Sequence, residues 1–147
     1  MKTLCHLLIL VAAMLVPQVA FAQEEADVIF DADSCIAAVA DSCPIDYKDE
    51  WAITSVTTEA DTVHLELQVP SSLAGFLPML AGEGDNVRLV WLRQMVYFGV
   101  PWRQLCRGII AARRVLVIDL RPKDSRVSAE IIINPDKLEK LNATIKD

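Results

Sequence analysis

Histidine is nearly absent from this sequence, and its scarcity removes several kinds of catalytic site. Only His6 and His64 occur among the 147 residues. Multi-histidine zinc sites and H-E-x-x-H metalloproteases need at least two imidazoles side by side. A Ser-His-Asp or Cys-His triad would have to use His64. Because His64 stands on the polar side of an alternating segment, we expect it to be an exposed strand residue.

Glycine is also scarce, with five residues, and the glycine-rich signatures of nucleotide and acyl-transfer sites are missing. The sequence contains no G-x-x-x-x-G-K-[ST] loop, no G-x-G-x-x-G turn and no G-x-S-x-G elbow. It has no C-x-x-C pair, and its acidic residues do not follow the frame of a calcium loop. We therefore expect no metal and no cofactor, and no motif here resembles a known family.

The first 22 residues have the pattern of a secretory signal peptide. Lys2 supplies the positive charge, Leu7 to Val16 form the apolar run, and Ala20 and Ala22 supply the small side chains before cleavage. The apolar run is too short for a spanning helix, which needs about 20 apolar residues. We expect cleavage after Ala22 and a secreted or periplasmic product that is not inserted into a membrane.

Negative and positive charges occupy different halves of the remaining chain. Residues 23–87 hold 14 acidic side chains and one basic one, Lys48, whereas residues 88–147 hold 12 basic and 6 acidic ones. Halves of opposite sign either dock on one another or present surfaces that attract different partners. We interpret the pattern as halves that interdigitate and partly cancel. The net negative charge and export argue against a nucleic-acid partner.

The hydrophobic pattern predicts one α+β domain over residues 34–147, after an acidic flexible leader at residues 23–33. The segment 61–69 is the clearest strand, because apolar and polar residues alternate strictly. The segment 87–100 is apolar on nearly every side, which is typical of a helix buried all round. Helices are predicted at 35–41 with Ser34 as the N-cap, 71–80, 87–100, 102–112 and 137–145, and strands at 51–58, 61–69, 115–120 and 127–133.

Two hairpins separated by helices predict an antiparallel sheet of about four strands, covered by helices. The order of elements in the two halves also suggests a weak internal α-β-β-α repeat.

Three cysteines follow the predicted signal peptide: Cys35, Cys43 and Cys106. An odd number allows at most one intramolecular disulfide. On one helix, Cys35 and Cys43 would be about 12 Å apart along the axis, beyond the roughly 7 Å limit between bridged Cα atoms. We expect either a bridge from Cys106 to one of the other two or three buried thiols, since free cysteine is among the most buried residue types.

The clearest candidate site is a row of arginines that begins beside Trp102. Arg103 and Arg107 are four residues apart and share a helix face, and Arg114 continues that line. Guanidinium groups bind carboxylate, sulfate or phosphate in a bidentate manner and stack on indole rings. The hypothesis is that these four residues bind an anionic group, on a glycan or on an acidic segment of a partner protein. The alternative is a solvated helix face that neutralises the acidic half.

Two further functions stay open beside a small, exported, soluble binding module, which we favour. Cys106 lies between two arginines near a helix N-terminus, where a thiol pKa is lowered, so a thiol-dependent enzyme centred on Cys106 is one alternative. Its apolar neighbours Leu105 and Ile109 favour packing instead. The other alternative is a structural or assembly component that associates through its oppositely charged halves.

Overall fold

The computed structural model describes residues 30–145. The chain divides by its contacts into Met1–Phe30 and Asp31–Asp147, and only the second unit is described below. The predicted signal peptide and most of the predicted acidic leader lie outside the described residues. Within residues 30–145, no helix has the length and apolar character needed to cross a membrane.

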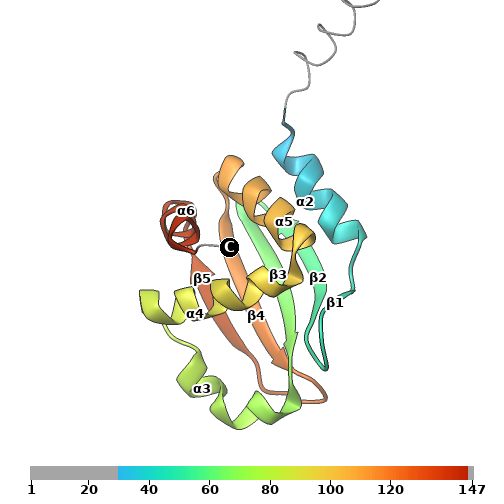
Figure 1. The fold of residues 1–147 in the computed structure, drawn as a ribbon, viewed down its shortest axis with the longest axis vertical. Helices are drawn as coiled ribbons and strands as arrows, with labels where there is room; N and C mark the ends of the chain where they lie inside the picture. The colour runs from blue at the N-terminus through green and yellow to red at the C-terminus, as the bar shows by residue number, and fades with distance from the viewer. Residues whose placement is uncertain (1–29, 146–147) are drawn as a thin grey trace, which may run out of the picture. The chain divides into compact units, whose positions relative to one another are not determined.

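The described residues form one five-stranded sheet with helices packed against one of its faces (Figure 1). The strands are β1 (Ile45–Asp46), β2 (Ala52–Glu59), β3 (Thr62–Val69), β4 (Val115–Pro122) and β5 (Ala129–Ile133). The helices are α2 (Ala32–Asp41), α3 (Leu77–Leu80), α4 (Asp85–Met95), α5 (Val100–Ala111) and α6 (Pro135–Thr144), with the 3-10 helices η1 (Ser71–Phe76) and η2 (Val96–Phe98).

The sheet is mixed, with the strand order β1-β2-β3-β4-β5. The β3 and β4 strands pair in parallel, from Thr62↔Val115 to Val69↔Pro122, and the other pairs are antiparallel. The α+β class is confirmed, but the prediction of four antiparallel strands is wrong. The helices between β3 and β4 form a crossover that carries the chain back to the end where β3 began, and such a connection produces parallel pairing.

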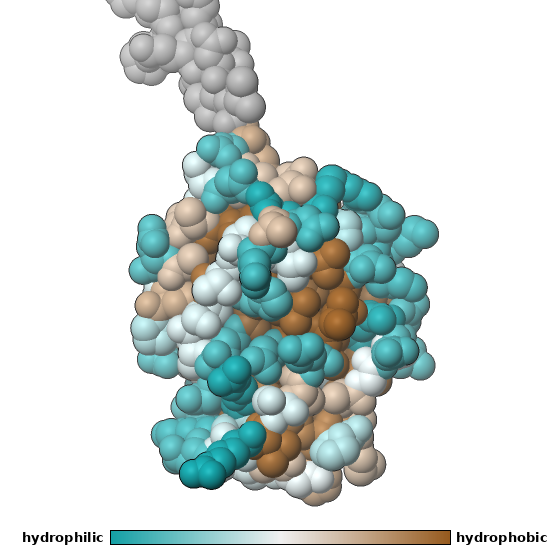
Figure 2. Space-filling view, turned by 180° about the vertical axis from the view of Figure 1, so that it is seen from behind, coloured by the Kyte–Doolittle hydropathy of each residue, from teal (hydrophilic) through white to brown (hydrophobic). Residues whose placement is uncertain are grey.

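The core lies between the helices and the sheet face that they cover. In β3, Val63, Leu65, Leu67 and Val69 are fully buried, whereas the polar residues between them are half-buried. The alternation predicted for this segment is therefore confirmed. The opposite side of the molecule is seen in Figure 2, where hydrophilic side chains surround smaller hydrophobic areas.

The directions of the strands argue against the internal repeat. Such a repeat would match α2 and β2–β3 with α5 and β4–β5. Because β2 is antiparallel to β3, and β3 is parallel to β4, the matched strands β2 and β4 run in opposite directions. Their helices α2 and α5 nevertheless pack against each other.

Several helix boundaries differ from the predictions. The α2 helix is capped by Asp31 instead of Ser34, so it includes the end of the predicted leader. Most of the predicted helix 71–80 is the 3-10 helix η1. The segment 87–100 is not buried all round, since Val90 and Tyr97 are exposed. It forms α4 and η2, and the chain then turns at Gly99, whose φ is 67°.

The α2 and α5 helices cross closely at Gly108. A Cβ atom at Gly108 would lie 3.0 Å from the carbonyl oxygen of Ala32 and 3.0 Å from Cγ1 of Ile36. Because glycine has no Cβ atom, the α2 backbone can approach α5 closely at this position. The crossing therefore holds α2, whose buried side chains are Ile36 and Val39, at the side of the domain that carries β2.

We expect the substitution Gly108→Val to lower the free energy of unfolding by about 2 kcal/mol, because it overpacks this crossing. The matched control is Ala111→Val, an exposed change in the same helix, which is expected to cost about 0.6 kcal/mol through helix propensity. Urea denaturation measures both. Equal losses for the two variants would contradict a close crossing at Gly108.

Candidate functional site

A groove of ≈ 280 Å³ lies between α2 and β2. We call it the α2–β2 groove. Its apolar walls come from the inward side of α2 and from β2, and an ion pair stands among its lining residues. The lining residues are Asp33, Ile36, Ala37, Ala40, Val56, Thr58 and Arg114.

The spacing of the α2 residues explains the groove. Asp33, Ile36, Ala37 and Ala40 are separated by three, one and three positions and so form one stripe along the helix. Ile36 fills its part of the interface and is buried. The two alanines have only a methyl group each, so the space between them and β2 stays open.

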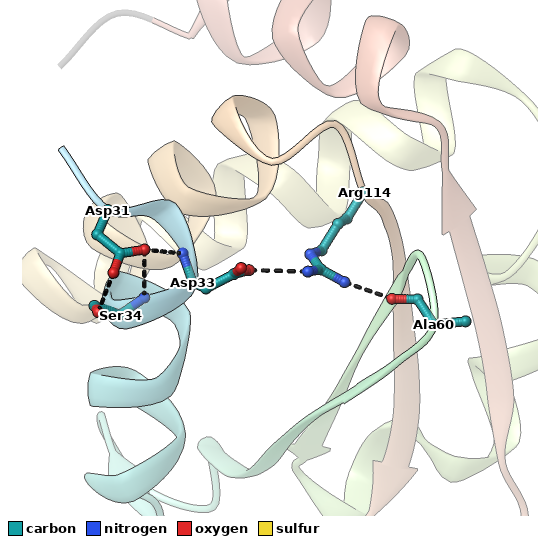
Figure 3. A network of polar contacts seen from close by, with 5 residues as sticks. All are labelled: Asp31, Asp33, Ser34, Ala60 and Arg114. Carbon is teal, nitrogen blue, oxygen red and sulfur yellow. Dashed lines mark hydrogen bonds and ion pairs between the residues drawn. The ribbon is translucent and has the colours of Figure 1, made fainter. Parts of the chain in front are cut away.

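Arg114 lies directly before β4, and its side chain reaches two other elements (Figure 3). Its Nη2 donates to Oδ1 of Asp33 at 2.9 Å, and its Nη1 donates to the carbonyl oxygen of Ala60 in the turn between β2 and β3. The Arg114 side chain is 20% exposed. Its Nε is buried and has no acceptor among the described residues, so this guanidinium holds unused hydrogen-bonding capacity.

Asp31 fixes the start of α2 next to this ion pair. Its carboxylate accepts hydrogen bonds from the backbone N–H groups of Asp33 at 3.1 Å and Ser34 at 3.3 Å, and from the Ser34 hydroxyl at 2.6 Å (Figure 3). The Ser34 bonds lower the pKa of Asp31, because they stabilise its charged form. The carboxylate therefore stays ionised and caps the helix.

The elements that form the groove are strongly acidic. Five carboxylates lie on α2, its N-cap residue, β2 and the turn that follows β2. Among the residues that line the groove, Arg114 is the only cation. The carboxylates belong to Asp31, Asp33, Asp41, Glu59 and Asp61. Such a surface attracts cationic groups more than anionic ones.

The structure separates the four residues of the predicted arginine row. Trp102 is 1% exposed and belongs to the core, so its indole offers no surface for stacking. Arg103 and Arg107 are exposed on α5. The α5 helix ends at Ala111, and the chain then turns, so Arg114 does not continue their line. Anion binding by Arg103 and Arg107 stays a prediction, and Arg114 belongs to the α2–β2 groove.

The three cysteines of the described chain are free thiols, and the predicted disulfide from Cys106 is not formed. Cys106 is 3% exposed, and burial raises its pKa to about 12. The lowering expected from Arg103 and Arg107 is wrong, because both guanidinium groups are exposed while the thiol points into the core. This geometry contradicts a catalytic thiolate at Cys106.

Ion pairs join the acidic and basic halves of the sequence. Arg114 pairs with Asp33, Arg121 with Glu66, and Lys137 with Asp85. The pairing of β3 with β4 places one strand of each half in the middle of the sheet. The interpretation that the halves interdigitate is therefore confirmed for the described residues.

A second, smaller hollow of ≈ 170 Å³ lies beside α3 and α4 and is lined by Met79, Leu80, Asn86, Val87 and Val90. Sequence reasoning missed both cavities. A signal existed for each: residues 69–82 form an uncharged run that ends at this hollow, and the alanines of α2 recur at helical spacing. We favour the α2–β2 groove as the site, because it combines apolar walls with polar groups.

The burial of Cys106 predicts its reactivity. In the native protein near neutral pH, iodoacetamide should label Cys35 and Cys43, which are partly exposed, before Cys106. Cys106 should react only after urea unfolds the chain. Mass spectrometry of the labelled peptides distinguishes the three positions, and rapid native labelling of Cys106 would contradict its placement in the core.

No protein-family model and no curated protein sequence matches this chain. A crystal structure of a candidate secreted protein from Pseudomonas aeruginosa resembles it with a TM-score of 0.50 and 13% identity, over 73% of this chain and 88% of that one. The pilotin EpsS of the Vibrio vulnificus type 2 secretion system has a TM-score of 0.46 and 9% sequence identity, over 73% of this chain and 87% of that one. The pilotin AspS of the Vibrio cholerae type II secretion system has a TM-score of 0.45 and 13% sequence identity, over 80% of this chain and 98% of that one. The first likeness concerns the fold alone.

Proposed function

We propose that this protein is an exported binding module whose site, the α2–β2 groove, takes an apolar segment of a partner protein. The observation that carries the proposal is the lining of the groove. Ile36, Ala37, Ala40 and Val56 offer apolar contacts, and the Asp33–Arg114 ion pair offers polar ones. Binding sites commonly combine mostly apolar walls with a few polar groups that orient the ligand.

The chemistry of the lining favours binding over catalysis. The titratable side chains of the groove are Asp33 and Arg114, and each is the other's partner at 2.9 Å. Thr58 supplies the one hydroxyl of the lining, and the one carboxylate there, Asp33, is already paired with Arg114. Nucleophilic catalysis needs a general base within hydrogen-bond reach of the nucleophile.

Export is part of the proposal and depends on the signal-peptide pattern of residues 1–22. A protein partner suits the size and apolar character of the groove, whereas the comparisons give no support to an anionic glycan. Binding of an anion at Arg103 and Arg107 and assembly through charged surfaces stay separate predictions.

The groove can be tested by filling it. The variant Ala37→Trp places an indole in the groove, while Ala38→Trp places the same group on the exposed side of α2 and serves as the control. Two lysine-flanked synthetic peptides act as probes, one extended with valine alternating with threonine, and one helical with leucine at helical spacing. Calorimetry measures their affinity for the wild type and both variants.

We expect at least one peptide to bind the wild type. The affinity of Ala38→Trp for that peptide should stay within twofold of the wild type. The affinity of Ala37→Trp should fall at least tenfold, which corresponds to about 1.4 kcal/mol. Circular dichroism checks that both variants stay folded. Absence of binding of both peptides at ~1 mM, or equal binding to the two variants, would refute the proposed function.

A further inference from the structure

We infer that the segment bound in the α2–β2 groove is an extended peptide with basic flanks, which adds to the sheet as a strand along the outer edge of β2. This inference rests on the proposed function and specifies the conformation and charge of the partner. It follows from the hydrogen bonding of β2, from the position of the groove beside it, and from the charge of the surrounding elements.

Most of the outer edge of β2 has no strand beside it. The β1 strand is two residues long and pairs only through Ile45↔Ile53 and Asp46↔Ala52. From Ser55 to Glu59, β2 pairs with β3 alone among the described residues. This open stretch is about as long as a common strand in globular proteins.

The hairpin geometry shows which backbone groups face outward. The strands β2 and β3 are joined by the two-residue turn Ala60-Asp61, closed by the pair Glu59↔Thr62. Closing pairs of two-residue hairpins exchange hydrogen bonds, and hydrogen-bonded and non-hydrogen-bonded pairs alternate along an antiparallel ladder. The backbone groups of Glu59 and Thr57 therefore point to β3, and those of Thr58 and Val56 point outward.

A contact at the open edge supports this assignment. The backbone N–H of Val56 faces Cys43, which lies outside the sheet, and it partly offsets the rise in the pKa of that thiol that burial causes. At Thr58 the outward N–H and C=O have no strand partner among the described residues. A peptide strand laid beside β2 would satisfy both groups, because strand addition supplies main-chain hydrogen bonds at an exposed sheet edge.

The groove lies where the side chains of such a strand would point. Val56 and Thr58, whose backbone groups face outward, both line the groove. Residues directly opposite each other on neighbouring strands project from the same face of the sheet. Every second side chain of the added strand would therefore enter the groove beside Ala37 and Ala40, so the backbone and side-chain contacts would form together.

Up to Thr58, the open part of the β2 edge lacks charged residues and prolines, two of the features that usually block strand addition. Natural edges are protected by charged residues, prolines or bulges. Residues 51–58 contain no charged residue and no proline, and the bulge of β2 lies at its other end, between Ile53 and Ser55. The open part is uncharged up to Glu59.

Charge complementarity selects a basic peptide. Five carboxylates lie on the elements that flank the groove, and four remain when Asp33 is counted with its partner Arg114, the one cation of the lining. A peptide with lysine or arginine at its ends would gain from this field, and the gain would fall with added salt.

The peptide backbone provides the first test. The extended, lysine-flanked peptide is prepared with N-methyl groups on alternate residues in two registers, so that one version blocks the amides that face β2 and the other blocks the amides that face solvent. We expect the register that blocks the amides facing β2 to lose at least tenfold in affinity, because it removes the backbone hydrogen bonds to the β2 edge, and the other register to stay within threefold. Glutamate flanks in place of lysine should also weaken binding.

The protein provides the second test. The substitution Thr58→Pro removes an outward N–H that takes no part in the β2–β3 ladder, and proline is tolerated at such edge positions. The control Thr58→Val keeps the N–H and the shape of the side chain. We expect the affinity of Thr58→Pro for the extended peptide to be at least fivefold lower than that of Thr58→Val, because both variants lose the hydroxyl and only the proline variant loses the N–H. In the wild type, bound peptide should slow hydrogen exchange of the Thr58 amide.

The outcomes separate this inference from the proposed function. If the helical peptide binds in the groove and the extended one does not, or if both N-methyl registers bind equally, the groove is a binding site but strand addition is wrong. If neither peptide binds, the proposed function itself fails. If the protein alone dimerises in analytical ultracentrifugation and Thr58→Pro abolishes the dimer, the occupant is a second copy and the inference of a peptide partner is overturned.

Discussion

The close crossing of α2 and α5 at Gly108 is the contact on which the candidate site depends. The α2 helix buries only Ile36 and Val39, so its position is set mainly by where α5 allows it to approach. The absence of a Cβ at Gly108 brings the α2 backbone against α5, and Trp102 and Leu105 of α5 belong to the same buried core as the strands. The groove is the space that this placement leaves between α2 and the edge of β2.

The hydrogen bonds of Arg114 also hold α2 beside β2. Arg114 joins the first turn of α2, the β2–β3 turn and the start of β4. An exposed ion pair contributes little to stability, but here the partly buried guanidinium bonds to a carbonyl oxygen as well as to a carboxylate. The opposite charges of the two halves therefore serve to position elements that are far apart in the sequence.

Local patterns predicted the elements well, and contacts between distant residues decided what they could not predict. The alternation in β3 and the proline at the start of α5 are local signals, and both elements formed as expected. The direction of β4 depends on the crossover through α4 and α5, which no local pattern encodes. Similarly, the spacing of Arg103 and Arg107 predicted a shared helix face, but it could not reveal that Trp102 faces the core while Arg114 lies beyond the end of the helix. The groove was missed because it is bounded by small residues, whose significance appears only when their neighbours in space are known.

The parallel pairing of β3 with β4 also has a consequence for how the chain acquires its structure. The β2–β3 hairpin is local and can form early, whereas the register from Thr62↔Val115 to Val69↔Pro122 joins residues separated by the whole crossover. Contacts of such long sequence separation form slowly, since the loop must close before the pairing is gained. Until α4 and α5 have packed, β3 has an exposed apolar face and an unpaired edge, so the nascent domain passes through a stage in which both edges of its first hairpin are open to other chains.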